Sequence, residues 1–311
     1  MKSPSIPLPD TPLGKHGWPW MNSDPYPTDL IDNRPWPKIS IVTPNYNCGE
    51  FLEETIRSVL LQGYPNLEYI IIDGGSTDCS LEIINKYAPW LAYWRTQSDQ
   101  GQSAAINNGF RMASGEIMGW LNSDDYYQPH TLFRVALEVN LEKKRYIVMG
   151  EVHEVDARRT IIRRWKSRVP TLYSLLFQHR LCLLRGLVVM PCQPSVFWHR
   201  KVFESLGLLR EDLKYAMDYD YWLKALRSHY NFQYMADVLS NYRFHAGSKS
   251  NQGWQNFYRE WRGVAKENFS TLTPRQKISA EFYWWFLLFP LSILTLPYRV
   301  YSYVVLGIKS G

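Results

Sequence analysis

Apolar runs and amphipathic stretches alternate through the first half of the chain. Short β-branched runs predict strands, and the stretches between them place apolar residues at helical spacing. The predicted strands are residues 39–43, 67–72, 91–95 and 117–121, and the predicted helices are 51–61, a segment ending near Tyr87, and 103–113. This β-α-β-α-β-α-β order predicts an α/β fold with a Rossmann-like, mostly parallel central sheet flanked by helices.

A polar loop follows each of these predicted strands. The loops contain Tyr46, Asp73, Asp99 and the adjacent pair Asp124 and Asp125. The carboxyl ends of parallel strands share one edge of a sheet, and open α/β proteins bind their ligands at that edge. The sequence therefore predicts one crevice to which four strand ends contribute.

The pair Asp124 and Asp125 supports two interpretations. Adjacent carboxylates at a strand end can hold a hard divalent cation, with water or substrate phosphates completing the coordination. The same residues also suit a surface turn in which Asp125 helps to cap the helix after Pro129. The pair by itself leaves both interpretations open.

The second half of the chain mixes strands and helices less regularly. The predicted strands are residues 146–149, 151–155, 160–165 and 238–244, with a hairpin turn at 156–159, and the predicted helices are 129–141, 171–184, 202–208 and 215–226. Asp218 and Asp220 lie two residues apart in the last helix, so one can face a crevice while the other stabilises the helix start. His245 follows the last strand and is either a loop residue or a metal ligand.

Composition changes at both ends of the chain. Residues 1–37 are rich in proline and predict an extended arm without the apolar core of a signal peptide. Residues 251–311 are expected to form a helical, membrane-associating segment, because residues 282–308 are almost purely apolar apart from one arginine. This pattern, with its aromatic start and two prolines, favours binding to a membrane surface, and leaves burial against the domain or a true span as alternatives.

The overall composition narrows the class of partner. A net charge of +6 favours an anionic ligand such as a nucleoside diphosphate or a phospholipid headgroup. No dense run of Lys and Arg is present, which argues against nucleic acid. The four cysteines match no zinc-binding pattern and indicate reduced thiols in a cytoplasmic protein.

Taken in order, the motifs resemble those of family 2 glycosyltransferases with the GT-A fold. The matching segments are residues 39–47, 72–81, 99–109 and 115–125, followed by 193–198 and 217–222. The resemblance covers about residues 38–250. It implies a nucleotide-sugar half at 38–128 and an acceptor half at 129–250.

The resemblance also implies roles for individual residues. The residues that would contact the nucleotide sugar are Pro44, Tyr46, Asp73, Asp99, Gln102 and Asp124. Mn²⁺ or Mg²⁺ would bind at Asp124, Asp125 and His245. Asp218 matches the general base, and Gln193 and Trp222 match positions on the acceptor side.

Three features depart from patterns found in this family. Asn122 stands where the D-x-D metal motif has its first acid, and Gly74 follows Asp73 where many members have a second Asp. The Gln-x-x-Arg-Trp motif of processive synthases is absent. Its absence favours transfer of a single sugar over polymerisation.

The resemblance thus implies an inverting transferase that moves one sugar, from a donor of the UDP-sugar type, to a hydroxyl of a saccharide or lipid-linked acceptor. The expected setting is surface polysaccharide assembly at the cytoplasmic face of the membrane. One alternative is a nucleotidyltransferase-like enzyme, but residues 44–50 lack the basic side chains it would need. Another is a catalytically degenerate membrane-bound module, against which the complete set of acidic residues argues.

Overall fold

The first half of the chain forms the parallel part of one sheet in a computed structural model that describes residues 7–22, 35–139, 146–185, 190–251 and 254–288. Strands β1 (Ile39–Asn45), β2 (Leu67–Asp73), β3 (Tyr93–Thr96) and β4 (Ile117–Trp120) pair in parallel in the order β3-β2-β1-β4. The intervening helices are α1 (Gly49–Leu60), α2 (Ser80–Tyr87) and α3 (Gln102–Met112). These elements confirm the predicted alternation.

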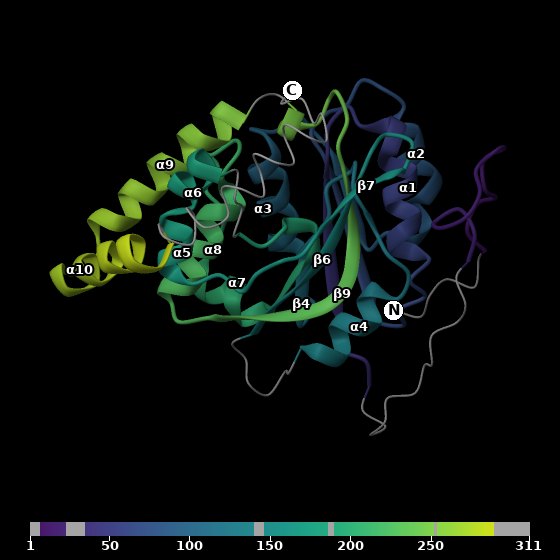
Figure 1. Cartoon of the computed structure of the whole chain (residues 1–311). Coiled ribbons are helices and arrows are strands. Elements are labelled where there is room, and N and C mark those ends of the chain that lie inside the picture. The colour runs from purple at the N-terminus through teal and green to yellow at the C-terminus, as the bar shows by residue number, and fades with distance from the viewer. Residues whose placement is uncertain (1–6, 23–34, 140–145, 186–189, 252–253, 289–311) are drawn as a thin grey trace.

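Alternating side chains on these strands fill two separate cores. Val42, Ile70 and Ile72 face one way and pack with α3, whereas Ile41 and Ile71 face the other way and pack with α1 and α2. Successive side chains of a strand point to opposite faces, so a strand that is apolar throughout needs helices on both sides. Figure 1 shows α3 on one side of the sheet and α1 with α2 on the other.

The second half of the chain extends the same sheet with strands of both directions. Strand β8 (Val196–His199) pairs antiparallel with β4 and with β6 (Tyr146–Val155), and β9 (Asn231–Arg243) pairs in parallel with β6. The short strands β7 (Ile161–Trp165) and β5 (Tyr126–Tyr127) pair antiparallel with β6 and β9. The full sheet is therefore mixed, and the predicted all-parallel pairing holds for the first four strands. A tight turn joins β6 directly to β7, and such a turn can connect only antiparallel neighbours.

The helices of the second half cover the side of the sheet on which α3 lies. They are α5 (Leu172–Leu176), α6 (Gln178–Arg185), α7 (Arg200–Leu206), α8 (Met217–Arg227), α9 (Trp254–Ser270) and α10 (Pro274–Tyr283). Helix α4 (Thr131–Glu138) is the exception, because its buried side chains pack in the same core as those of α1. The predicted helix 171–184 is two helices, and the strands predicted at 146–149 and 151–155 are one.

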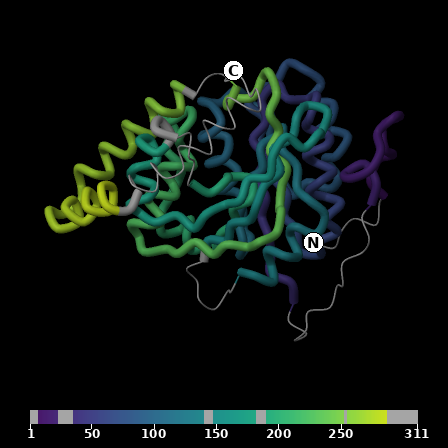
Figure 2. Tube along the Cα trace, in the orientation of Figure 1, coloured from purple at the N-terminus to yellow at the C-terminus, as the bar shows by residue number. Residues whose placement is uncertain are grey.

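The N-terminal arm packs on α1 through one buried arginine. The Arg57 side chain is only slightly exposed and donates to the carbonyl oxygens of Pro9, Pro19 and Trp20 at 2.9–3.2 Å. The indole of Trp18 donates to the carbonyl of Tyr127 at 2.7 Å. Figure 2 shows this purple segment beside the helices of the first half.

The C-terminal helices carry an exposed apolar stripe. Ile278, Phe282, Trp285 and Phe286 expose 54–71% of their surface, whereas Trp284 is buried in the core. These positions follow helical spacing along α10 and the π-helical turn η4 (Trp284–Leu288). No helix in the described part of the chain is both long and apolar enough to cross a membrane. The remainder of the predicted segment 282–308 lies outside the described residues.

Candidate active site

A cavity of about 1140 Å³ opens at the carboxyl ends of the first-half strands. Pockets for one drug-sized ligand occupy roughly 300–1,000 Å³, so this cavity is slightly larger than that range. The predicted site residues on its wall are Pro44, Tyr46, Asp99, Gln102, Asp124, Gln193, Asp218 and His245. The structure thus brings together residues spread over two hundred positions of the chain, whereas Asp73, Asp125 and Trp222 are not on the wall.

Asp73 lies beneath the wall and organises the loop above it. Its carboxylate accepts hydrogen bonds from Asn45 Nδ2 (2.7 Å), Ser76 Oγ (2.5 Å) and Thr96 Oγ1 (2.5 Å), and it is fully buried. Burial alone would raise the pKa of Asp73, but the hydrogen bonds from Ser76 and Thr96 lower it below its ordinary value. Both carboxylate oxygens of Asp73 thus accept hydrogen bonds from within the chain.

Tyr46 and Asp99 form the end of the cavity nearest to β1, β2 and β3. The Tyr46 ring is 66% exposed, and Asp99 is half-buried beside Gly74. A Cβ atom added to Gly74 would lie 3.2 Å from the Asp99 carboxylate. Glycine at this position therefore allows the loop to lie close to Asp99.

Asp124 and His245 form a polar pair on the cavity wall. The Oδ2 atom of Asp124 lies 3.1 Å from Nε2 of His245, and the ring of His245 packs on Phe51 with centroids 4.6 Å apart. The backbone amide of Gly247 donates to Nδ1 of His245 at 3.2 Å. A neutral ring that accepts at Nδ1 carries its proton on Nε2, which then donates to Asp124.

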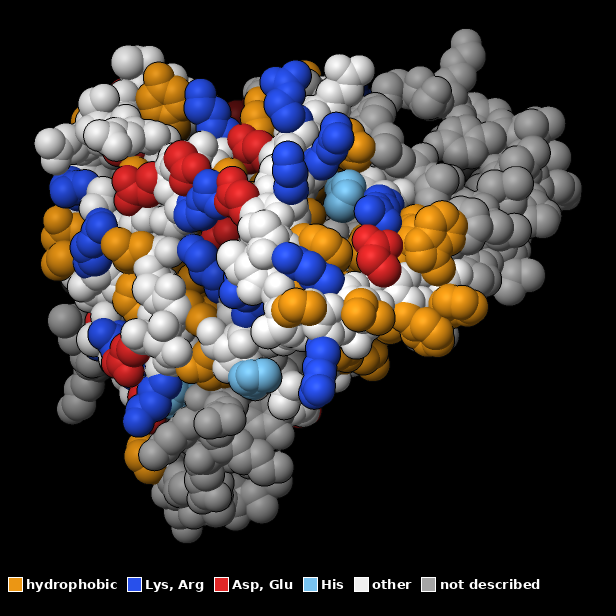
Figure 3. Space-filling model, turned by 90° about the vertical axis from the view of Figure 1, so that its left-hand side faces the viewer, with side chains coloured by type: hydrophobic (Ala, Val, Ile, Leu, Met, Phe, Trp, Pro, Cys, Tyr) orange, Lys and Arg blue, Asp and Glu red, His pale blue; other side chains and the backbone are white. Residues whose placement is uncertain are grey.

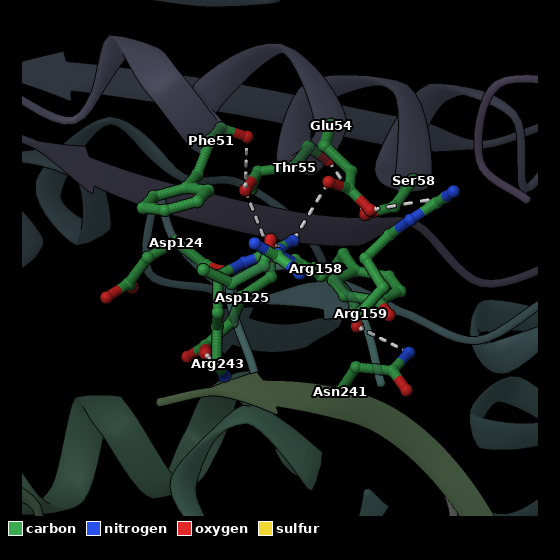
Figure 4. Close-up of polar contacts among 12 residues, drawn as sticks. Phe51, Glu54, Thr55, Ser58, Asp124, Asp125, Arg158, Arg159, Asn241 and Arg243 are labelled. Carbon is green, nitrogen blue, oxygen red and sulfur yellow. Dashed lines mark hydrogen bonds and ion pairs between the residues drawn. The ribbon is translucent and has the colours of Figure 1, made fainter. Parts of the chain in front are cut away.

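Asp125 turns away from Asp124 and into the protein. Its Oδ1 accepts from the backbone amide of Arg243 at 2.9 Å, and its Oδ2 accepts from Asn122 Nδ2 at 3.2 Å. Figure 4 shows Asp125 beside Arg243. Burial first, and the charge of Asp124 second, raise the pKa of Asp125 well above its ordinary value.

These contacts place the Asp125 side chain inside the protein and leave only Asp124 of the pair on the cavity wall. Asp125 does not line the cavity, and the N-cap residue of helix α4 is His130, whose side chain makes no capping hydrogen bond. Among the described residues, no group of three or more His, Cys, Asp or Glu side chains is arranged to hold a metal ion. The buried position of Asp125 follows from its bond to the last residue of β9, which the local sequence does not reveal.

Asp218 and Asp220 begin helix α8 and point in different directions, as their spacing predicts. Asp218 lines the cavity, whereas Asp220 is buried and paired with Lys224 at 2.9 Å and Arg210 at 3.8 Å. Burial raises the pKa of Asp218 to about 6, and a hydrogen bond from the Tyr219 amide opposes part of this shift. A half-buried carboxylate with such a pKa is suited to accept a proton near neutrality.

The two residues predicted on the acceptor side, Gln193 and Trp222, lie in different surroundings. Gln193 lines the cavity, donates to the Trp120 carbonyl at 2.7 Å and accepts from Asn122. Trp222 is completely buried and stacks on Trp120 with ring centroids 6.0 Å apart. Trp222 therefore belongs to the aromatic core beneath the site. Burial of the large apolar indole stabilises this core.

The cavity wall carries positive charges that were not among the predicted site residues. The cationic side chains there are those of Arg163, Lys166, Arg168, Lys214 and Lys249. The first three belong to residues 158–168, where six of eleven residues are Lys or Arg and none is acidic, so the expectation that the chain has no dense basic run was wrong. Lys249 donates to Gln102 at 2.7 Å, and its charge acts on both Asp124 and Asp218.

Comparison with known proteins identifies the family. The model of "Glycosyl transferase family 2" matches residues 40–207. An uncharacterized glycosyltransferase of Rickettsia felis is 30% identical over 237 residues, covering 72% of this chain and 38% of the relative. A PGL/p-HBAD biosynthesis glycosyltransferase of Mycobacterium tuberculosis is 28% identical over 216 residues, covering 68% of this chain and 78% of the relative. The chain thus spans well under half the length of the first of these relatives.

Solved structures support the same fold. TarS residues 1–349 of S. aureus, in complex with UDP-GlcNAc, align with a TM-score of 0.59 and 18% identity over 80% of this chain and 73% of that one. The mannosyltransferase PcManGT of Pyrobaculum calidifontis, in complex with GDP-Man and Mn²⁺, aligns with a TM-score of 0.53 and 19% identity over 89% and 80%. The fold is therefore of the GT-A type that the sequence predicted. Because the family model covers more than half of its residues, the chain belongs to glycosyl transferase family 2.

Proposed function

We propose that this chain transfers a single sugar, with inversion, from a UDP-sugar to a hydroxyl of a saccharide or lipid-linked acceptor in surface polysaccharide assembly. One observation carries the proposal. A single cavity is lined by Tyr46 and Asp99, by the pair Asp124 and His245, and by Asp218. Tyr46 and Asp99 suit a nucleoside, the pair Asp124 and His245 suits a cation-bound diphosphate, and Asp218 suits an acceptor hydroxyl.

The donor is assigned to the half of the cavity formed by residues 38–128. The exposed ring of Tyr46 offers a stacking face for the base, and Asp99 can accept hydrogen bonds from the nucleoside. We assign Pro44 and Gln102 to the same donor surface. Asp73 supports this surface from below through its bonds to Asn45 and Ser76.

The donor atoms at Asp124 and His245 fit Mn²⁺ or Mg²⁺. A carboxylate oxygen and an imidazole nitrogen lie 3.1 Å apart on the wall, and a cation between them would take the place of the Nε2 proton. When bound, the cation stabilises the departing diphosphate as a Lewis acid. We assign its protein ligands to Asp124 and His245 and give Asp125 the role of fixing the turn, because Asp125 is buried and its two oxygens accept hydrogen bonds.

Asp218 is the proposed general base. As the acceptor oxygen bonds to the anomeric carbon, its proton passes to the Asp218 carboxylate. The bond from the anomeric carbon to the phosphate oxygen breaks, and its electron pair leaves with the diphosphate. A single displacement of this kind inverts the anomeric carbon. Asp218 belongs to the other half of the fold from Asp124, which favours attack from the side opposite the leaving group.

The acceptor is assigned to residues 129–250. Lys166 and Arg168 are exposed cations on that wall, and Gln193 is a neutral hydrogen-bonding group at its base. Positive charge at this position favours an acceptor that bears an anionic group such as a phosphate. This charge supports the lipid-linked alternative over a neutral saccharide.

Neither competing function gains support from a particular contact. A nucleotidyltransferase would need cations in the loop after β1, and that loop has none. A catalytically degenerate membrane-bound module would be expected to lack at least one of the acidic residues of the site. Asp99, Asp124 and Asp218 all line the cavity.

Titration with nucleotides tests the proposed function most directly. We expect UDP to bind more tightly than GDP or dTDP in isothermal titration calorimetry, and Mn²⁺ to strengthen the binding at least tenfold, because the diphosphate shares the cation with Asp124 and His245. The same titration with EDTA is the control. Absence of binding to all three nucleotides, with and without Mn²⁺, would contradict the proposed donor site.

We further propose that the stripe on α10 and η4 places the chain at the cytoplasmic face of a membrane. Phe282, Trp285 and Phe286 are exposed there, and Figure 3 shows apolar side chains beside Lys and Arg on this side of the molecule. Aromatic side chains next to cations are typical of helices that lie in the interface of an anionic bilayer.

Binding to lipid vesicles tests this membrane contact. The wild-type chain is expected to sediment with vesicles that contain phosphatidylglycerol, and replacing both Phe282 and Phe286 with Ser should reduce the bound fraction severalfold, because the exposed apolar area is lost. Replacing the exposed Leu137, which lies on α4, with Ser is the matched control. Equal sedimentation of all three proteins would assign binding to other residues.

A further inference from the structure

Arg243 is a buried cation at the end of β9 that joins three separate segments. Its side chain is 1% exposed, and its guanidinium donates to Glu54 Oε2 on α1 at 2.9 Å, to the Asp124 carbonyl at 2.9 Å and to the Ala157 carbonyl at 3.2 Å. Its backbone amide donates to Asp125 at 2.9 Å. Figure 4 shows Arg243 lying between the Asp125 turn and Glu54.

The surroundings of Arg243 stabilise its buried positive charge. The Glu54 carboxylate is itself buried, and the guanidinium packs over the rings of Phe51 and Tyr126 at 4.6 and 5.2 Å. Burying a cation is costly unless a buried anion and hydrogen-bond acceptors surround it. The planar fork of arginine can reach several acceptors at fixed angles, which the ammonium of lysine cannot do.

These contacts connect the two residues that we assign as cation ligands. Arg243 binds the backbone of Asp124 directly, and His245 follows two residues later in the same chain segment. Phe51, one turn before Glu54 on α1, contacts both the guanidinium and the His245 ring. The hydroxyl of Thr55 on the same helix donates to the Asp125 carbonyl at 2.6 Å.

We propose that Arg243 and Glu54 are positioning residues that hold Asp124 opposite His245. Neither residue lines the cavity, so they act through the turn at 122–125 and through the end of β9. The inference rests on the proposed function for the identity of the cation site. The contacts through which Arg243 and Glu54 hold the 122–125 turn, which we call the tether, can be measured without a cation. Groups behind a metal ligand commonly change metal affinity by about 10- to 100-fold when they are mutated.

Arg159 provides a matched control within the chain. Its guanidinium also approaches Glu54, at 3.7 Å, but its hydrogen bonds go to the carbonyls of His16 and Trp18 in the N-terminal arm. It is partly exposed. Arg159→Lys therefore alters a second arginine beside Glu54 while the contacts of the 122–125 turn stay in place.

Hydrogen–deuterium exchange of the cation-free protein tests the tether. In Arg243→Lys and in Glu54→Gln, the amides of residues 122–125 are expected to exchange at least tenfold faster than in wild type, while amides in α3 and β2 keep their protection. Arg159→Lys should match wild type in both regions. If Arg243→Lys fails to fold, the exchange of residues 122–125 in Glu54→Gln decides the outcome, because this substitution keeps the size of the side chain.

Calorimetry with Mn²⁺ in the presence of UDP provides the second readout. We expect Arg243→Lys to weaken Mn²⁺ binding about 10- to 100-fold and to leave the affinity for UDP without a cation unchanged. A folded Arg243→Lys variant with wild-type exchange and wild-type Mn²⁺ affinity would overturn the inference. Faster exchange at 122–125 in a protein whose wild type binds no Mn²⁺ would support the tether and reject the proposed cation site instead.

Discussion

Asp218→Asn is expected to lower kcat for sugar transfer by roughly 10²–10⁴-fold, the usual contribution of a positioned general base. The amide has nearly the shape of the carboxyl group but cannot accept the proton of the acceptor hydroxyl. Because Asp218 stands on the acceptor side, binding of UDP with Mn²⁺ should stay within a few-fold of wild type. Steady-state kinetics, together with calorimetry of the donor nucleotide, separates the two effects.

The pH dependence of the wild-type enzyme should report the same residue. The pKa of Asp218 is raised to about 6, so the carboxylate is mostly protonated below pH 6 and mostly ionised above it. The base works only when ionised, so kcat/KM is expected to rise with pH, with a midpoint near 6, and to level off above. A rate that is constant from pH 5 to 8 would contradict this assignment.

Asp220→Asn is the matched control for Asp218→Asn. Asp220 lies two residues away on the same helix turn, but it is paired with Lys224 and Arg210 and does not line the cavity. The substitution leaves buried polar contacts incomplete, so a lower melting temperature is expected, with kcat per folded molecule close to wild type. If Asp218→Asn retains full turnover, or if Asp220→Asn loses as much kcat, the base is another group.

Asp124→Asn is expected to weaken Mn²⁺ binding about 10- to 100-fold and to reduce kcat/KM by at least as much. An amide oxygen is a poorer ligand for a hard cation than a carboxylate oxygen, and the cation stabilises the leaving diphosphate only when it is held in place. Calorimetry of Mn²⁺ in the presence of UDP measures the first effect. Added Mn²⁺ should restore part of the lost activity.

Asp125→Asn distinguishes the roles of the two adjacent acids. Asp125 is buried, and its two oxygens accept hydrogen bonds from Arg243 and Asn122, so the amide nitrogen of Asn would face one of these donors. We therefore expect Asn at this position to lower the melting temperature but to change Mn²⁺ affinity only a few-fold. Equal losses of Mn²⁺ affinity in both variants would return Asp125 to the set of ligands.

Much of the fold could be predicted because it depends on local patterns. The first four strands are short β-branched runs, and the helices between them have apolar residues at helical spacing, so their order predicted a parallel sheet. The polar residues after those strands could be expected to meet, since parallel strands end at one edge. The spacing of Asp218 and Asp220 likewise fixed their opposite directions in advance.

The tertiary structure decided which side of the wall each predicted residue occupies. Asp125 faces inward because the amide of Arg243, 118 residues later, binds it, and Trp222 is buried because Trp120 and Trp198 surround it. Strand β8 enters antiparallel between β4 and β6, which no local pattern indicates. The sequence by itself determined the elements and the polar strand ends. Only contacts between distant segments brought Asp124, His245 and Asp218 to the wall of one cavity.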